Sequence, residues 1–132
     1  MRLEVHELIS NHLYMYSHLK GKLVEKNPAY VVIDVNGIGF YLNISLNTYS
    51  NIASDESCML YTHLVVREDA HLLFGFYNQQ ERGIFRQLIT VSGVGANTAR
   101  LILSSLNVDE LQEAIITGNV SVLQSVKGIG NK

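Results

Sequence analysis

Two short glycine turns in the last third of the sequence are the residues with the clearest potential for chemistry. Residues 93–95 read Gly-Val-Gly, and residues 128–130 read Gly-Ile-Gly. Both turns follow a Leu-x-x-Val segment, and the two copies are separated by 35 residues throughout. Repetition at a fixed spacing indicates one supersecondary unit that is used twice.

This unit, the helix-hairpin-helix pattern, predicts a phosphate-binding turn between two helices. Glycines let the backbone approach a ligand closely because they carry no Cβ atom. The turn leads into a helix N-terminus, where unpaired N–H groups and the helix dipole favour an anion such as a DNA phosphate. One copy alone would fit a plain interhelical turn equally well, whereas two copies with matching flanks favour phosphate binding.

We expect the phosphate contacts to come from residues in and just after each turn. The apolar residue between the glycines, Val94 or Ile129, should point inward and hold the hairpin in place. The candidate DNA-binding residues are Gly93, Val94, Gly95, Ala96, Asn97, Thr98 and Arg100 at the first turn, and Lys127, Gly128, Ile129, Gly130, Asn131 and Lys132 at the second.

Two adjacent acids, Glu68 and Asp69, form the second candidate site. They lie in a polar segment, 67–70, between two apolar runs. A solvated turn is the usual role of such a pair. A metal site is an alternative, but no other acid or histidine lies at a ligand spacing, and the histidines form no Cys/His zinc pattern. The pair alone therefore predicts an exposed acidic turn and no metal site.

The acidic pair lies within a β-rich first half of the chain. Branched and aromatic residues at 30–35 and 40–44 flank Asn36 and Gly37, a strong hairpin signal because both residues tolerate positive φ. Apolar runs on both sides of the acidic pair complete roughly five strands within residues 15–76. A small closed barrel of the OB type leaves no exposed strand edge and is the economical arrangement.

The glycine turns lie in a helical second half. From Gln79 onward, apolar residues recur at helical spacing. Asn107 with Glu110 predicts a helix N-terminus with a capping box, Gly118 is placed to end that helix, and Asn119 can begin a last short one.

The predicted fold class is therefore α+β with two domains. A five-stranded OB-fold barrel is expected over residues 15–78. A tandem helix-hairpin-helix domain, with its second hairpin truncated, is expected over residues 79–132. Residues 1–14 precede an internal methionine that opens a new pattern, so we expect this extension to lie outside the fold.

Composition argues for a packed protein but offers little support for DNA binding. Hydrophobic residues make up 47% of the 132 residues, enough for a sizeable core, and the net charge is −2. A nucleic-acid binder is expected to carry a basic face, yet even residues 79–132 have a net charge of only +1. Phosphate binding would therefore depend on backbone N–H groups and a few placed cations.

Several classes of protein are disfavoured. The single cysteine, Cys58, lies in an apolar run that predicts burial and can form no internal disulfide, which fits a reducing cytoplasm. No apolar stretch approaches ~18 residues, so no membrane span is expected. Gly21-Lys22 is followed by leucine, so the chain has no nucleotide-binding P-loop. His63 and His71 are expected on strand faces near the acidic pair, with DNA contact as the less favoured role.

Over residues 15–132 the sequence resembles the RuvA family, whose members hold Holliday junctions for the RuvB motor and, in the wider complex, the RuvC resolvase. Helix-hairpin-helix turns alone are weakly specific, whereas Val-Val-Arg-Glu-Asp-Ala beside an OB-like pattern is much more specific. The matching segments are 15–21, 35–40, 62–70, 73–76 and 80–82, followed by both glycine turns in order.

This resemblance implies a non-catalytic, cytoplasmic protein of recombination and repair that binds four-way junction DNA without a cofactor. It implies a homotetramer, or an octamer, with the junction on one face. It also implies that Glu68 and Asp69 form a central acidic pin. Four copies of the pair at the crossover would repel phosphates and reject continuous duplex DNA, which is a source of specificity.

Two departures from the family pattern limit these expectations. The family often carries Pro-Lys after the first glycine turn, whereas this chain has Ala96-Asn97, which removes a phosphate-binding charge. The sequence also stops at Lys132, so we expect an incomplete second hairpin and loss of the RuvB contact. The alternatives are a general duplex or single-strand binder, a fragment with little activity, or an enzyme of the glycosylase or nuclease class, for which no catalytic residue is visible.

Overall fold

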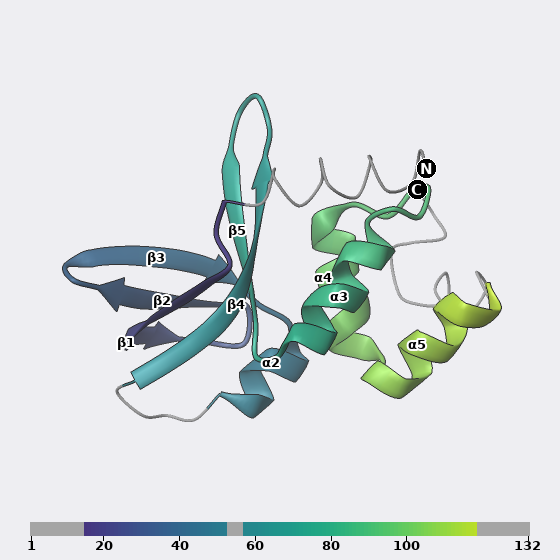
Figure 1. Ribbon diagram of the computed structural model, residues 1–132, viewed down its shortest axis with the longest axis horizontal. Coiled ribbons are helices and arrows are strands. Elements are labelled where there is room, and N and C mark those ends of the chain that lie inside the picture. Colours follow the sequence, from purple (N-terminus) through teal and green to yellow (C-terminus); the bar gives the residue numbers. More distant parts are fainter. Residues whose placement is uncertain (1–14, 53–56, 119–132) are drawn as a thin grey trace.

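A computed structural model of the chain describes residues 15–52 and 57–118 (Figure 1). The first half forms a closed barrel with the strand order β1-β2-β3-β5-β4. All neighbouring strands are antiparallel except β3 and β5, which pair in parallel at Asn43 and Phe74. The strands are β1 (His18–Lys26), β2 (Tyr30–Val35), β3 (Ile38–Asn43), β4 (Ser57–Val66) and β5 (His71–Phe76). The predicted OB-type barrel is confirmed.

The tight turn between β2 and β3 has the conformation that its sequence predicts. Asn36 has a φ of 53° and Gly37 a φ of 94°, so both central residues have positive φ, as a hairpin with the normal strand twist requires. The Asp34 carboxylate accepts a hydrogen bond from the Gly37 N–H at 2.8 Å. The Asn-Gly prediction is therefore correct in both position and conformation.

The barrel encloses a small apolar core. Strand residues alternate between this interior and the outer surface, as the period of two requires. Cys58 is part of the core and is a buried free thiol, as predicted. The buried members are Val31, Ile33, Leu42, Ile44, Cys58 and Leu60.

Helix α2 (Leu46–Asn51) lies between β3 and β4, where the sequence predicted only β structure. Its N-cap is Ser45, whose hydroxyl oxygen accepts a hydrogen bond from the Thr48 N–H at 3.0 Å. The sequence analysis predicted the roughly five strands of residues 15–76 but not this helix between them. The helix is only six residues long and has no apolar period, so its cap and its tertiary contacts stabilise it.

Three longer helices follow the barrel. They are α3 (Gln79–Leu88), α4 (Ala96–Ser105) and α5 (Val108–Thr117). The predicted capping box at α5 is present, with both hydrogen bonds between Asn107 and Glu110 formed. Gly118 ends α5 in the left-handed conformation with a φ of 67°, as predicted. None of the helices in the described ranges is long and apolar enough to cross a membrane.

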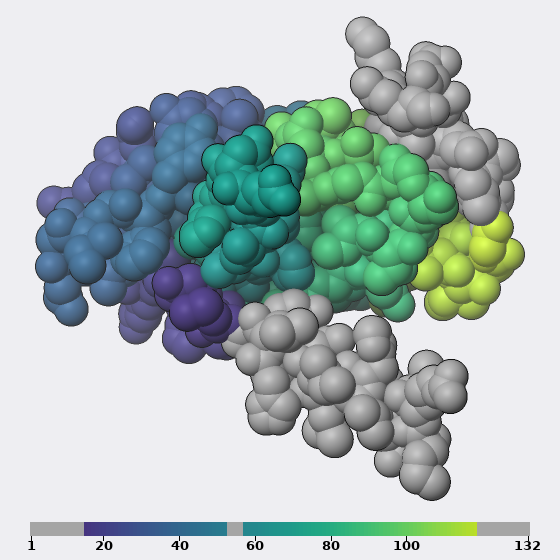
Figure 2. Space-filling view, turned by 90° about the horizontal axis from the view of Figure 1, so that it is seen from above, coloured from purple at the N-terminus to yellow at the C-terminus, as the bar shows by residue number. Residues whose placement is uncertain are grey.

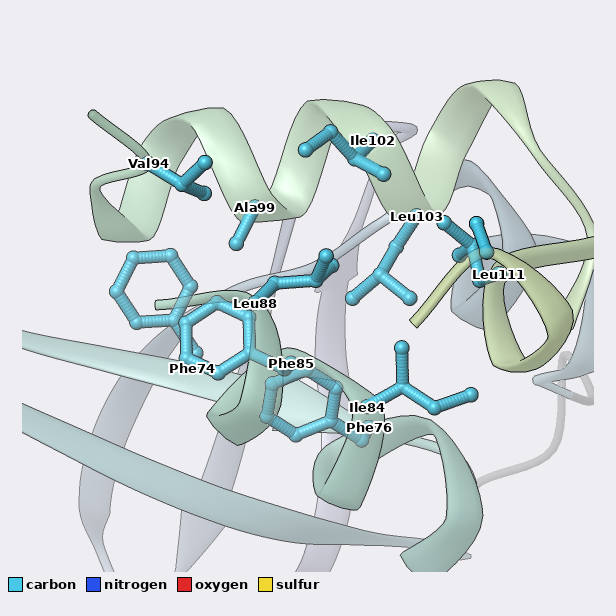
Figure 3. Packing of buried hydrophobic residues seen from close by; sticks show 11 residues of the cluster. Phe74, Phe76, Ile84, Phe85, Leu88, Val94, Ala99, Ile102, Leu103 and Leu111 are labelled. Atoms are coloured by element: carbon cyan, nitrogen blue, oxygen red, sulfur yellow. The ribbon is translucent and has the colours of Figure 1, made fainter. Parts of the chain in front are cut away.

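A second core joins the helices to the last strand of the barrel (Figure 3). Phe85 of α3 lies at its centre, with its ring centroid 5.1 Å from that of Phe74 and 5.0 Å from that of Phe76. Both of these partners belong to β5, so the packing crosses the predicted domain boundary at residue 78. The division into two domains remains a prediction.

Candidate nucleic-acid interface

The acidic pair lies at the tip of a long β-hairpin. Strands β4 and β5 pair from Tyr61 and Phe76 out to Val66 and His71. The four-residue turn that follows is closed by a 2.8 Å hydrogen bond from the N–H of Arg67 to the carbonyl of Ala70. Figure 1 shows this hairpin projecting well beyond the rest of the barrel.

Glu68 and Asp69 are both exposed at that tip. Figure 2 looks down on the hairpin, in teal, which lies between the barrel and the helices. Within residues 15–52 and 57–118, no three His, Cys, Asp or Glu side chains are grouped closely enough to hold a metal ion. The two acidic side chains are therefore exposed together at the tip of the hairpin.

The first glycine turn connects α3 to α4. Gly93 has a φ of 85°, which favours glycine, and a Cβ atom added at Gly93 or Gly95 would have no neighbour within 4 Å among residues 15–52 and 57–118. The backbone at this turn is therefore open to an approaching ligand. Val94, between the two glycines, is only 7% exposed and packs into the helical core (Figure 3). The prediction that Val94 points inward is confirmed.

The N-terminus of α4 is left without a side-chain cap. Its N-cap residue is Gly95, whereas α2, α3 and α5 are each capped by the side chain of a serine or an asparagine. The first backbone N–H groups of any helix have no acceptor within the helix. Here they belong to Ala96, Asn97 and Thr98, and together with the helix dipole they favour an anion.

Arg100 lies on the side of α4 that faces the barrel. Its Nη1 donates to the carbonyl oxygen of Ile44 at 3.1 Å, and its Nε and Nη2 donate to the Asn97 side-chain oxygen at 3.1 and 2.9 Å. Burial lowers the pKa of the Arg100 guanidinium from its ordinary value. The structure therefore gives Arg100 a contact between α4 and the residue that follows β3, and its contact with DNA remains a prediction.

The second glycine turn lies outside the described residues. This applies to the candidate residues Lys127, Gly128, Ile129, Gly130, Asn131 and Lys132, to the short helix predicted after Asn119, and to the extension at residues 1–14. The predicted repeat of the phosphate site consequently remains a prediction from the sequence.

His63 and His71 differ in their surroundings. His71 is exposed next to the hairpin turn, whereas His63 on β4 is buried, with its ring centroid 5.3 Å from that of Phe85. Its Nδ1 accepts a 3.1 Å hydrogen bond from Nε of Arg86. Burial, followed by the charges of Arg86 and Arg82, lowers the pKa of His63 to about 4. His63 is therefore a neutral residue of the protein interior.

Glu81 is a buried charged residue whose role the sequence did not reveal. It lies in the first turn of α3 and is 0% exposed. Its carboxylate accepts hydrogen bonds from the side chains of Ser45, Asn47 and Thr48. Burial raises the pKa of the Glu81 carboxyl above its ordinary value, and these hydrogen bonds oppose that rise.

Two family patterns match the chain. The RuvA N terminal domain matches residues 15–75, and the SAM-like helix-hairpin-helix tandem matches residues 85–132. The first pattern covers the barrel with most of β5, and the second begins within α3 and includes both glycine turns.

Proteins named Holliday junction branch migration complex subunit RuvA are similar to this chain over most of its length. The protein from Christiangramia forsetii is 59% identical over 118 residues, and that from Flavobacterium psychrophilum is 50% identical over the same length. The protein from Neisseria meningitidis is 54% identical over 119 residues. In each case the match covers 89% of this chain and 61% of the relative. The chain thus spans about three fifths of the length of these relatives, and it contains a RuvA N-terminal domain followed by a helix-hairpin-helix tandem.

Proposed function

We propose that the chain binds four-way DNA junctions as a non-catalytic scaffold subunit of a branch-migration complex. The relatives are named as subunits of such a complex. One observation supports the proposal. The glycine turn that precedes the uncapped helix α4 and the exposed acidic hairpin are both attached to the same hydrophobic core. Val94 of the turn and Phe74 of the hairpin strand belong to the same buried cluster (Figure 3).

In this account the two features have opposite electrostatic roles. The N–H groups at the start of α4 bind a backbone phosphate of a DNA arm, which positions the protein without reading bases. The carboxylates of Glu68 and Asp69 repel phosphates and so favour the open centre of a junction over a continuous duplex. Because both groups are exposed, the discrimination should weaken as salt screens the charges.

The assembly and partners that we propose follow from the family. Four copies around the crossover would form a homotetramer, and two such tetramers facing each other would form an octamer. The partners would be a RuvB motor and a RuvC resolvase, in recombination, repair and the SOS response to DNA damage. We place this activity with the chromosome in the bacterial cytoplasm, and it needs no cofactor.

A gel-shift titration tests the proposal. A four-way junction and a linear duplex of matched sequence are titrated with the protein at about 50 mM and about 200 mM salt, since counterion release makes affinities at one salt concentration hard to interpret. We expect a junction preference of about tenfold or more, equivalent to about 1.4 kcal/mol, which decreases at the higher salt. Equal binding of both DNAs would favour a general duplex binder instead.

A further inference from the structure

The Glu81 carboxylate ties the first helix after the barrel to the N-cap and the first turn of α2. Ser45 Oγ donates to its Oε2 at 2.6 Å, and Asn47 Nδ2 donates to the same oxygen at 3.4 Å. Thr48 Oγ1 donates to its other oxygen. Both carboxylate oxygens are thus bound by donors from a single short stretch, which we call the 44–48 segment.

The same segment also holds α4. Nη1 of Arg100 donates to the carbonyl of Ile44 at 3.1 Å. The Leu46 N–H donates to Oγ of Ser104 at 3.0 Å. The two helices that flank the first glycine turn are therefore both hydrogen-bonded to the 44–48 segment. That segment lies between barrel strands β3 and β4 in the sequence.

The connection between β5 and α3 is held at the same place. Only Tyr77 and Asn78 separate the strand from the helix, so this short link is where the helices would rotate relative to the hairpin. The Tyr77 N–H donates to Oγ1 of Thr48 at 3.2 Å, and Thr48 is in turn a donor to Glu81. A rotation at the link would therefore break the hydrogen bonds of a fully buried carboxylate.

Directional bonds matter here because much of the remaining contact is apolar. Arg82 and Arg86 of α3 also donate hydrogen bonds to β4, but to the Thr62 carbonyl and the His63 ring and not to the 44–48 segment. The Phe85 cluster stabilises the packing of α3 on β5, but apolar burial is non-directional and tolerates small rotations. A buried carboxylate that loses its donors is unfavourable, so its hydrogen bonds select one orientation of α3. The acidic tip lies at the far end of the long β4–β5 hairpin. A small rotation of α3 relative to the hairpin would therefore change the distance between this tip and the glycine turn considerably.

We propose that Glu81 is a positioning residue, which sets the placement of the first phosphate-binding turn relative to the acidic hairpin by binding the 44–48 segment. This inference rests on the proposed function, since the placement matters only if both features meet one DNA junction. Glu81 itself contacts no DNA. It acts by holding α3 and, through the shared segment, by keeping α3 and α4 in one arrangement.

The test uses spin labels on the full chain. Cysteines replace Val66 near the hairpin tip and Ser105 at the end of α4, both exposed, in a Cys58→Ala background, and pulsed electron paramagnetic resonance measures the distance between the labels. Glu81→Met has similar volume and good helix propensity but no acceptor. Glu81→Gln keeps one acceptor oxygen, and serine and threonine hydroxyls can also accept from its amide. Gln80→Met, at the exposed neighbouring position, is the matched control.

We expect Glu81→Met to broaden or shift the distance distribution and to lower the preference for junction over duplex by about fivefold or more, a typical size for coupling between sites. Glu81→Gln should restore a narrow distribution, and Gln80→Met should match the parent. Circular dichroism at the measuring temperature ensures that each variant is folded. If Glu81→Met is unfolded, Thr48→Val takes its place, because it removes a donor to Glu81 and the acceptor of the Tyr77 N–H at similar volume. A broadened distribution in folded Thr48→Val supports the proposal and an unchanged one overturns it.

An unchanged distance distribution in folded Glu81→Met would overturn the proposal. The distance measurement needs no DNA, so it also separates this inference from the proposed function. If the parent protein showed no junction preference but Glu81→Met still changed the distances, the proposed function would fail while the positioning role of Glu81 would stand.

Discussion

The ring centroids of Phe74 and Phe85 lie 5.1 Å apart. Phe74 belongs to β5, the second strand of the acidic hairpin, and Phe85 belongs to α3, the helix before the glycine turn, so this contact joins the two. Phe85 is fully buried and also contacts Phe76 and His63. The two features assigned to DNA recognition are therefore joined by one aromatic cluster. Its integrity should determine both the stability of the protein and the separation of the two features.

Phe85→Ala should destabilise the protein by about 3–5 kcal/mol, the usual cost of removing a buried phenylalanine, because it removes apolar contacts and leaves a cavity. Urea unfolding followed by circular dichroism measures this change. Leu101→Ala is the control, since Leu101 is 39% exposed on α4. A loss of less than about 1 kcal/mol in Phe85→Ala, a value usual for exposed positions, would contradict the central place of Phe85.

The double variant Glu68→Ala/Asp69→Ala should bind linear duplex more tightly than the parent does, since it removes the charges that repel phosphates at the hairpin tip. Its affinity for the four-way junction should change much less. Asp109→Ala/Glu113→Ala removes two exposed acids from α5 and changes the net charge equally. Gel-shift titration should show a reduced junction preference only in the hairpin variant. Equal effects of the two double variants would indicate a general charge effect.

Gly95→Asp should separate stability from DNA binding. Gly95 has a φ of −88° and a ψ of 179°, which any residue can adopt, and no atom in the described part of the chain lies within 4 Å of its Cβ position. Aspartate at an N-cap accepts bonds from the first helical N–H groups and is more favourable there than glycine by about a few tenths of a kcal/mol. The same carboxylate would occupy the position proposed for a phosphate.

We therefore expect Gly95→Asp to raise or maintain the melting temperature while DNA affinity falls at least severalfold. Gly95→Ala is the matched control, because it adds a Cβ atom without a charge or a cap. It should retain more of the DNA affinity than Gly95→Asp does. Undiminished DNA binding by a stably folded Gly95→Asp protein would exclude the start of α4 as a phosphate site.

His63 should contribute a pH-dependent term to stability. Its pKa is lowered to about 4 in the folded protein from about 6.5 in an unfolded chain, so the unfolded chain binds more protons between these values. The stability that neutral His63 contributes is present above pH 6.5 and is lost as the pH falls toward 4. The full loss would be about 3 kcal/mol. Burial raises the pKa of the Glu81 carboxyl, so its contribution to stability is lost as the pH rises, opposite to that of His63. The contribution of His63 is therefore isolated by comparing the parent with a His63 variant.

In His63→Gln this term disappears, and the free energy of unfolding should vary less with pH between about 4 and 6.5 than in the parent. Urea titrations at several pH values provide the measurement. Replacing the exposed His71 by glutamine serves as the control and should leave the pH dependence unchanged. Parallel pH profiles for the parent and His63→Gln would show that His63 is not held neutral by its surroundings.

Local signals account for the parts of the fold that the sequence predicted correctly. Alternating strands, the Asn36-Gly37 turn and the Asn107-Glu110 capping box each depend on residues a few positions apart. The inward direction of Val94 also follows from a short pattern, in which an apolar residue lies between two glycines.

Contacts between distant residues account for what the sequence could not predict. Helix α2 has little helical pattern of its own and depends on its cap and on neighbours such as Ser104. Glu81 lies three residues after Asn78, so by itself it would be interpreted as part of a capping box, yet its side chain binds Ser45, 36 positions earlier. Arg100 follows the glycine turn, and nothing in its local sequence indicates that its guanidinium reaches Ile44, 56 positions away.

Photo-crosslinking shows whether the acidic hairpin meets the crossover of a bound junction while the glycine turn binds a DNA arm. A crosslinker is attached at Val66→Cys near the hairpin tip, or at Ser92→Cys beside the glycine turn, both in the Cys58→Ala background and both bound to a labelled four-way junction. We expect the Val66 probe to react with nucleotides at the crossover and the Ser92 probe to react with the backbone of a DNA arm. Crosslinks from the Val66 probe spread evenly along the arms would contradict this expectation.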